Sequence, residues 1–187
     1  MPRRLLKLLS APCFAAILAA AGPAFAQVKQ DPVQAIWAYD GTWKTDIQHL
    51  DTPHSKAAHD SSMLRNECWK SGQYVACRQI VDGDSKVLIV FTCVDAHQCS
   101  SYQIPPDGGQ SGSGKLLIDG DTWTFPWSST EDGKTTWFRV VNVWSSHDTI
   151  EFRQEFSTDQ QHWTTMATGH ESRVQMGRMP TDPLPRR

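Results

Sequence analysis

The strongest constraint on the fold is a succession of ten short segments, between residues 42 and 169, in which apolar and polar residues tend to alternate. These segments are rich in β-branched and aromatic residues, and Gly, Asp, Ser and Pro cluster between them. A period of two places successive side chains on opposite faces of a strand. The expected strands are 42–50, 61–70, 73–82, 86–94, 99–104, 114–119, 121–127, 135–144, 148–157 and 161–169.

Tight turns connect these segments, as at Ser71-Gly72 and Asp132-Gly133, and no helical pattern separates two of them. Consecutive strands without helices between them pair antiparallel. An up-and-down meander of this kind removes its exposed edges by closing into a barrel. The sequence therefore predicts an all-β fold, an antiparallel up-and-down barrel of about ten strands. A sandwich of two sheets is the alternative.

One short helix is expected before the first strand, over residues 31–39. Asp31 can cap its first turn, Pro32 suits the first helical position, and Val33 and Ile36 share a face. The run Val87–Val94 is apolar on both faces, so its outer side also needs a cover. We expect the helix to provide that cover.

Residues 1–26 have the three parts of an export signal. Three cations precede an apolar stretch, and Ala24-Phe25-Ala26 offers the small residues of a cleavage site before Gln27. The apolar stretch is shorter than the roughly 20 residues of a permanent membrane span. We expect a signal peptide at 1–26, one barrel domain at 27–176, a flexible tail at 177–187 and no stable membrane anchor after cleavage. The predicted location is periplasmic or secreted.

Charge argues against nucleic acid as a partner. The whole chain has 18 basic and 20 acidic residues, and loss of three cations with the signal changes the net charge from −2 to −5 (15 minus 20). Nucleic acids and anionic membranes bind basic surfaces. An acidic domain of this kind favours a small molecule or a protein as its partner.

Four cysteines remain after cleavage, and an even number in an oxidising compartment predicts two disulfides. Three pairings are possible. A two-residue turn at Gly72-Gln73 would place Cys68 opposite Cys77, and Cys93 with Cys99 could close a short loop. A zinc site with four thiolates is the alternative, although the chain has no C-x-x-C pair.

Several short motifs, in order, resemble a known family. They are Gly41-Thr42-Trp43, Cys68-Trp69 with Cys77, Gly120-Asp121-Thr122-Trp123-Thr124-Phe125, and Ser157-Thr158-Asp159 followed by Trp163. The first resembles the G-x-W signature of lipocalins, and the set is similar to bacterial lipocalin-like proteins of unknown function. The resemblance covers about residues 35 to 170. It implies a calycin-type barrel with a ligand cavity at one end. Independently of the resemblance, tryptophans are most often core residues, and we expect Trp43 to close the barrel floor.

Histidines offer no metal-binding pattern. Seven are present, without H-x-H or H-E-x-x-H spacing. His49 shares a strand face with Trp43 and is expected to point inward. His170, near the end of the last predicted strand, resembles the late axial histidine of nitrobindin-like heme barrels, so it is a heme candidate. Apart from that resemblance, the sequence predicts no cofactor.

Two arginines on largely apolar strand faces are candidate anchors for an anion. Arg139 shares a face with Trp137 and Val141, and Arg78 shares a face with Tyr74. An arginine inside an apolar barrel needs a carboxylate partner or a bound anion. One interpretation is a fatty-acid-like ligand on Arg139, and the other is a structural ion pair. The candidate ligand-binding residues are Arg139, Arg78, Trp137, His49 and Tyr74.

Catalytic motifs are absent from the sequence. The loop Gly109–Gly114 resembles a G-x-S-x-G elbow, but Ser113 stands where the last glycine belongs. The sequence favours a non-enzymatic, exported protein that holds an apolar or amphipathic small molecule inside its barrel. An envelope interaction or assembly protein with a filled barrel is the first alternative, and a heme-binding barrel is the second. The ligand's identity, the openness of the barrel and the oligomeric state do not follow from the sequence.

Overall fold

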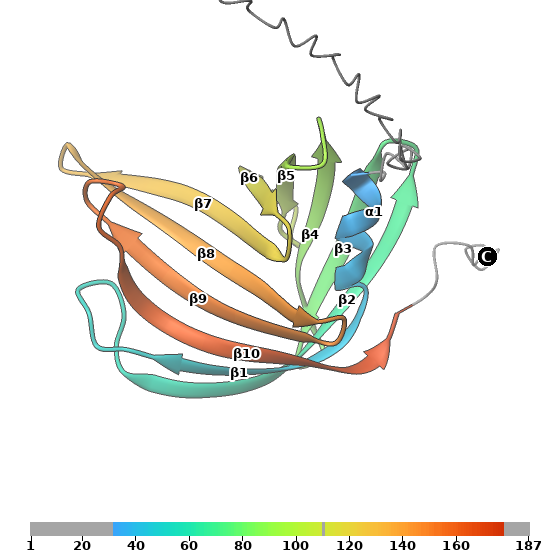
Figure 1. Ribbon diagram of the computed structural model, residues 1–187, viewed down its shortest axis with the longest axis horizontal. Coiled ribbons are helices and arrows are strands. Elements are labelled where there is room, and N and C mark those ends of the chain that lie inside the picture. Colours follow the sequence, from blue (N-terminus) through green and yellow to red (C-terminus); the bar gives the residue numbers. More distant parts are fainter. Residues whose placement is uncertain (1–31, 110, 178–187) are drawn as a thin grey trace, which may run out of the picture.

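A closed barrel of ten antiparallel strands forms the protein (Figure 1). The computed structural model describes residues 32–109 and 111–177, so the expected signal peptide and nearly all of the expected tail lie outside the described residues. The predicted all-β barrel is confirmed, and the sandwich is not formed. The strands are β1 (Gly41–His49), β2 (Ala58–Ser71), β3 (Tyr74–Val81), β4 (Asp84–Cys93), β5 (Gln98–Ile104), β6 (Gly112–Asp119), β7 (Thr122–Glu131), β8 (Lys134–Ser146), β9 (Thr149–Ser157) and β10 (Thr164–Met176).

The last strand differs most from its predicted bounds, because the residues before it form a hydrogen-bonded loop. Ser157 Oγ accepts the backbone N–H groups of Asp159 and Gln160. Asp159 Oδ1 accepts those of Gln161 and His162. Asp and Ser side chains commonly close such turns and compete with the sheet for backbone donors. As a result β10 begins at Thr164, but it runs on to Met176 along β1.

The barrel wall is least paired between β6 and β7. Only three residue pairs join these strands, the last being Leu117 with Thr124. Beyond Thr124, β7 continues to Glu131 paired with β8 alone, and Pro126 in this stretch has no N–H to donate. In Figure 1 the two strands diverge after their connecting turn. The pairing of the wall is therefore incomplete on this side.

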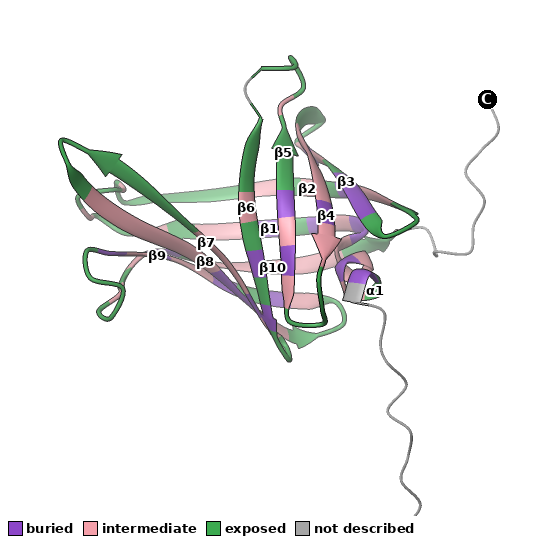
Figure 2. Cartoon of the chain, turned by 90° about the horizontal axis from the view of Figure 1, so that it is seen from above, coloured by how far each residue is buried: buried purple, intermediate pink, exposed green. Residues whose placement is uncertain are grey.

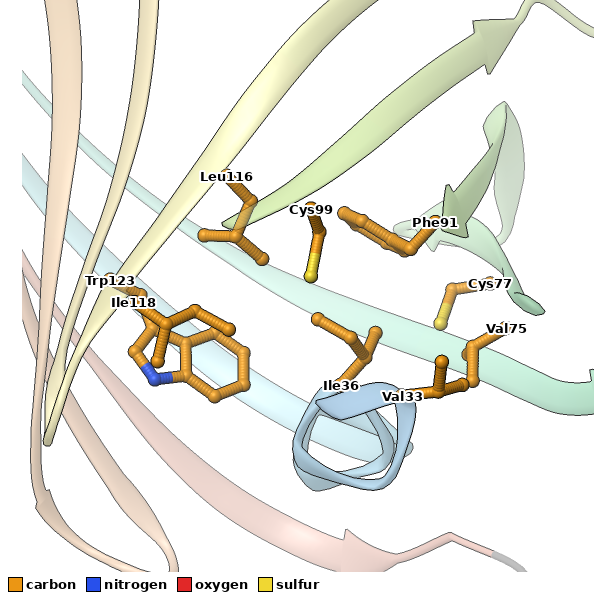
Figure 3. Packing of buried hydrophobic residues seen from close by; sticks show 9 residues of the cluster. All are labelled: Val33, Ile36, Val75, Cys77, Phe91, Cys99, Leu116, Ile118 and Trp123. Atoms are coloured by element: carbon orange, nitrogen blue, oxygen red, sulfur yellow. The ribbon is translucent and has the colours of Figure 1, made fainter. Parts of the chain in front are cut away.

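The N-terminal helix enters one end of the barrel. Helix α1 (Pro32–Ile36) is followed by a 3-10 turn, η1 (Trp37–Tyr39). Val33 and Ile36 are buried in the main apolar cluster, among side chains from β3 to β7 (Figure 3). Their neighbours are Val75, Cys77, Phe91, Cys99, Leu116, Ile118 and Trp123. A short helix was predicted correctly, but its expected position over the outer side of Val87–Val94 was wrong, because its apolar face fills the inside of the barrel.

The strand register identifies the inner face. Asn142 on β8 donates a hydrogen bond to Tyr39 Oη of η1, inside the barrel. Trp123 and Phe152 are the direct partners of Asn142 on β7 and β9. Because directly paired residues share a face and alternate residues face opposite ways, Phe138 points inward with Asn142, whereas Arg139 points outward.

Two disulfides join neighbouring strands at register positions. Cys68 pairs with Cys77 across β2 and β3, and Cys93 pairs with Cys99 across β4 and β5. Both predicted pairings are confirmed. Disulfides persist in oxidising surroundings, so these two indicate a non-reducing, extracellular type of environment. Among the helices that the structure describes, none has the length and apolar character of a membrane span.

Candidate binding site at the barrel floor

A cavity of about 120 Å³ lies inside the barrel next to η1. Its wall is formed by η1 and by inward-facing side chains of six strands, which are β2, β3, β4, β7, β8 and β10. The lining residues are Tyr39, Leu64, Asn66, Cys77, Gln79, Ile89, Phe91, Phe125, Asn142 and Glu171. Figure 2 shows that burial is greatest near α1 and that the far ends of β7 and β8 are exposed. We call this cavity and the residues that line it the floor of the barrel, and we call the end at which β7 and β8 are exposed the far end.

Tyr39 and Asn142 form a polar contact on this floor. Asn142 Nδ2 donates a hydrogen bond of 2.6 Å to Tyr39 Oη. Burial strongly raises the pKa of the Tyr39 hydroxyl, and the negative charge of Glu171 raises it further. Tyr39 is consequently a neutral phenol. Since the phenol oxygen accepts the bond from Asn142, its own proton is available to another acceptor in the cavity.

Glu171 brings a titratable carboxyl to the same cavity. It lies directly opposite Thr45 on β1 and Ile150 on β9. Burial raises the pKa of its carboxyl from 4.5 to about 7, although the adjacent His170 opposes this shift. Desolvation favours the neutral form of an acid. Glu171 therefore populates both protonation states near neutral pH.

Three buried polar atoms around the floor have no hydrogen-bond partner within the described part of the chain. They are Thr45 Oγ1, Asn66 Oδ1 and Trp144 Nε1. Asn66 lines the cavity, Thr45 is the register partner of Glu171, and Trp144 packs against Tyr39. An unsatisfied buried polar group costs about 1–3 kcal/mol, and native structures rarely tolerate it. Water or a ligand in the cavity would satisfy Asn66 Oδ1, the one of the three that belongs to a lining residue.

Three tryptophan rings pack around Tyr39 at the helix end of the barrel. Tyr39 contacts Trp123 with ring centroids 5.1 Å apart, and Trp144 with centroids 5.4 Å apart. Trp43 is fully buried, packs edge-on against Trp144 and donates from Nε1 to the backbone oxygen of Tyr39. These contacts hold the Tyr39 ring in place. Trp43 is therefore a core residue at the floor, as expected for a buried tryptophan.

Arg173 lies at the helix end of the barrel, in register with Trp43. Its Nε donates to Asp148 Oδ1 at 2.9 Å, and its two terminal nitrogens donate to the backbone oxygens of Ala38, Asp40 and His147. The guanidinium also lies over the Trp43 ring. All three nitrogens are engaged, so this buried cation serves the structure and is directed at protein acceptors.

The far end of the barrel is lined by aromatic side chains and by a contact between His49 and Asp60. His54, from the loop between β1 and β2, contacts the rings of Phe138 and Phe156, with centroids 5.2 and 4.5 Å apart. His49, a predicted site residue, faces the interior here and lies 3.1 Å from Asp60 Oδ2. Trp127 stacks on Phe138 and is 46% exposed. Solvent therefore reaches the inner face at this end.

Arg139 occupies a different position from the one expected. It lies on the outer face, in register with Glu155, and its Nε is 2.6 Å from Glu155 Oε2. Arg153 binds the other oxygen of the same carboxylate, and the Trp163 ring lies 3.9 Å from the Arg139 guanidinium. The interpretation of Arg139 as an interior anchor is not supported by this geometry, because its strand is apolar on both faces and the carboxylate partner lies outside.

The other predicted residues are also spread over the outer face. Arg78 lies there in register with Glu67 and forms an ion pair with it. Tyr74 is 39% exposed on the same face of β3, and Trp137 lies beside Arg139 on the outer face of β8. Of the five predicted ligand-binding residues, only His49 faces the interior. The structure does not bring the five together.

His170 also faces outward, because Gly169 and Glu171 face inward. Its Nδ1 lies 2.6 Å from Glu151 Oε1, and its Nε2 lies 2.7 Å from Ser172 Oγ. Heme coordination requires a free ring nitrogen directed into a pocket. In this structure both nitrogens are engaged, beside an open surface depression of about 430 Å³ that Asp46, Val143 and Thr168 also line.

The order Ser172–His170–Glu151 matches the chain of contacts in a nucleophile, base and carboxylate triad. Acyl transfer also requires N–H donors directed at the developing oxyanion. Here the surrounding backbone belongs to the paired strands β9 and β10, whose N–H groups serve the sheet ladders. The geometry therefore supports a surface hydrogen-bond network.

Sequence reasoning missed the residues that form the polar floor. These are Tyr39, Asn66, Asn142 and Glu171. Glu171 could have been found by extending the alternation of the last strand two residues beyond its predicted end. Tyr39 could not, because it reaches the floor through η1 and not through a strand pattern.

Comparisons with known proteins identify no family for this chain. No protein-family model and no curated protein matches it. Among solved structures, it is similar to the crystal structure of Rv2717c from M. tuberculosis, with a TM-score of 0.45 and 11% identity over 76% of this chain and 96% of that chain. A similarity at this level carries no argument about function.

Proposed function

We propose that the protein is an exported binder that holds a small amphipathic molecule inside its barrel. The observation that carries this proposal is the floor cavity, around which Thr45 Oγ1, Asn66 Oδ1 and Trp144 Nε1 have no partner among the described residues. Ligand sites are typically concave and mostly apolar, with a few converging polar groups. The floor is concave and combines apolar side chains with converging polar groups.

The inner wall suits the apolar part of such a ligand. Leu64, Ile89, Phe91 and Phe125 line the cavity itself. Farther from the helix, Phe138 and Trp127 continue the same inner face toward the exposed end. A chain of methylene groups would gain about 0.8 kcal/mol for each group that it buries against this wall.

Export is part of the same proposal. Two disulfides agree with an oxidising compartment, and the expected signal peptide would deliver the chain there. A carrier of apolar molecules has a physical role in such a compartment, because these molecules have low solubility in water.

A fluorescence experiment tests the proposal. The neutral dye N-phenyl-1-naphthylamine is titrated into the purified chain, and native mass spectrometry records any ligand that co-purifies. We expect saturable enhancement that Ile89→Trp weakens, because Ile89 lines the cavity. Leu88→Trp is the matched control, since Leu88 lies on the opposite face of the same strand. Melting temperatures show that both variants fold. Equal dye binding by the two variants contradicts the proposal, as does absence of binding.

A protein partner is the second candidate function, and the outer face of the barrel favours it. Trp69, Ala76, Val90 and Tyr102 lie side by side in register on β2 to β5. Tyr102 is 48% exposed and Ile104 is 37% exposed beside this row. Exposed apolar patches commonly mark interaction surfaces. Crosslinking that captures one envelope protein with the native chain, but not with Tyr102→Asp, would support this candidate.

A further inference from the structure

We propose that the floor cavity receives an uncharged head group, either a hydroxyl or a carboxamide, and discriminates against a carboxylate on the same alkyl chain. This inference rests on the proposed function and specifies its ligand class. Three properties of the floor carry it: the donors and acceptors left without partners, the acidic group already present, and the absence of a lining cation among the described residues.

The first property is the mixture of donors and acceptors around the cavity. Asn66 Oδ1 only accepts, Trp144 Nε1 only donates, and Thr45 Oγ1 can do either. A hydroxyl or a carboxamide both donates and accepts, so it can donate to Asn66 Oδ1 and accept from the Tyr39 hydroxyl, which both line the cavity. A carboxylate only accepts, and it would leave Asn66 Oδ1 unsatisfied.

The second property is the acidic group on the floor. The Glu171 carboxyl already lines the cavity, beside Tyr39 and Asn142. A ligand carboxylate would meet a group of like charge there whenever Glu171 is ionised. An uncharged head group avoids this repulsion. When Glu171 is ionised, its oxygens can accept from a hydroxyl or a carboxamide.

The third property is that, among the residues that the structure describes, no lysine, arginine or histidine lines the cavity. The nearby inward-facing cation is Arg173, and its nitrogens already donate to Asp148 and to backbone oxygens. His49 faces the interior at the far end, where it contacts Asp60. Recognition of a carboxylate typically uses a charged donor, often a bidentate arginine. The described floor offers none.

The size of the cavity limits it to a head group. Its volume is about 120 Å³, well below the roughly 300–1,000 Å³ of pockets that enclose a drug-sized ligand. A whole amphiphile does not fit into that space. The alkyl chain would therefore extend from the floor along Phe125 and Phe138 toward the exposed end.

The test compares three ligands with the same number of carbons. Dodecan-1-ol, dodecanamide and dodecanoate are used to displace N-phenyl-1-naphthylamine from the purified chain at about pH 8, where free alkanoic acids are ionised. We expect the alcohol and the amide to displace the dye at concentrations about tenfold lower than dodecanoate, because one unpaired acceptor and one like-charge contact separate the two classes. Glu171→Gln should improve displacement by dodecanoate and so narrow the difference between dodecanoate and dodecan-1-ol.

Glu151→Gln is the matched control, because Glu151 lies on the adjacent strand and faces outward to His170. It should leave all three displacement curves unchanged. Dodecanoate that competes as well as the alcohol, or better, overturns the head-group inference but leaves the proposed binding function standing. If the dye does not bind to the chain at all, the proposed function fails, and the inference fails with it.

Discussion

The guanidinium of Arg173 lies 4.0 Å from the centre of the Trp43 ring. The two residues are register partners on β10 and β1, the strands at the two ends of the chain's meander. Arg173 also reaches the backbone oxygens of Ala38 and Asp40 and so fixes the end of η1 against both strands. The contact therefore lies on the seam where β1 and β10 pair to close the barrel, next to the turn that carries Tyr39.

Replacement of Arg173 should therefore destabilise the fold. Its side chain is 4% exposed, and a smaller cation cannot reach Asp148 and the backbone acceptors together. We expect Arg173→Lys to lower the free energy of unfolding by about 2–4 kcal/mol. Urea unfolding, followed by tryptophan fluorescence, measures this change. Arg65→Lys is the control, because Arg65 is 53% exposed and forms a surface pair worth less than about 1 kcal/mol. Equal losses would contradict the role given to Arg173.

The pairing between Cys93 and Cys99 should contribute measurably to stability. Cys99 is fully buried, and the bridge closes a short loop between β4 and β5. In the chain-entropy model a loop of this length stabilises the folded state by about 2 kcal/mol. The double variant Cys93→Ala/Cys99→Ala should therefore unfold at lower urea concentration. Wild-type protein with added reductant should shift in the same direction. A variant as stable as the oxidised wild type would show that the bridge is not a stabilising element.

Strand positions and cysteine pairs were predictable because both depend on local patterns. A period of two and a two-residue turn fix which residues lie opposite each other, so Cys68 had to face Cys77 once the turn was placed at Gly72. The face of Arg139 was not predictable in this way. Its strand is apolar on both sides, and only the register with β9 reveals Glu155 as its partner.

The polar floor was unpredictable for a related reason. Tyr39 comes from a 3-10 turn, whereas Asn142 and Glu171 come from strands more than a hundred residues later. No spacing in the sequence links these three. Closure of the barrel brings them together, and so does the position of α1 inside it, which the sequence analysis placed outside.

The Arg139 and Glu155 pair should be structural and not ligand-binding. Glu155 is 6% exposed and holds both Arg139 and Arg153, so Glu155→Gln leaves two cations without their carboxylate. We expect a loss of about 3 kcal/mol in the free energy of unfolding. Glu67→Gln, which affects the exposed pair with Arg78, should cost less than about 1 kcal/mol.

Dye displacement tests whether the Arg139 side chain contributes to ligand binding as well as to stability. Arg139 lies on the outer face of the barrel. The variant Arg139→Met should therefore be less stable, but its displacement curve with dodecanoate should be unchanged. A large loss of dodecanoate binding in Arg139→Met, with the dye still bound, would instead restore Arg139 as an anion anchor.

The free energy of unfolding should decrease as the pH rises from about 4.5 to about 7, because of Glu171. Its carboxyl has a folded-state pKa of about 7 and an ordinary value of 4.5, so the folded protein binds more protons than the unfolded chain within this range. Unfolding therefore becomes easier as the pH rises through the range, and the effect is constant above it. The groups around Glu171 are Tyr39 from η1, Thr45 on β1, Ile150 on β9 and His170 on its own strand. Burial of the carboxyl is the largest cause of the shift.

Glu171→Gln should remove this component. The difference in unfolding free energy between wild type and Glu171→Gln, measured in urea, should change by about 1–2 kcal/mol across the range, since solvent screens a partly exposed group. Below about pH 4.5 the two proteins should be closest in behaviour, because the wild-type carboxyl is then neutral in both states. The Glu151→Gln control should follow the wild-type profile more closely, because Glu151 lies at the outer surface. If wild type and Glu171→Gln give parallel profiles, Glu171 is not the buried acid of the floor.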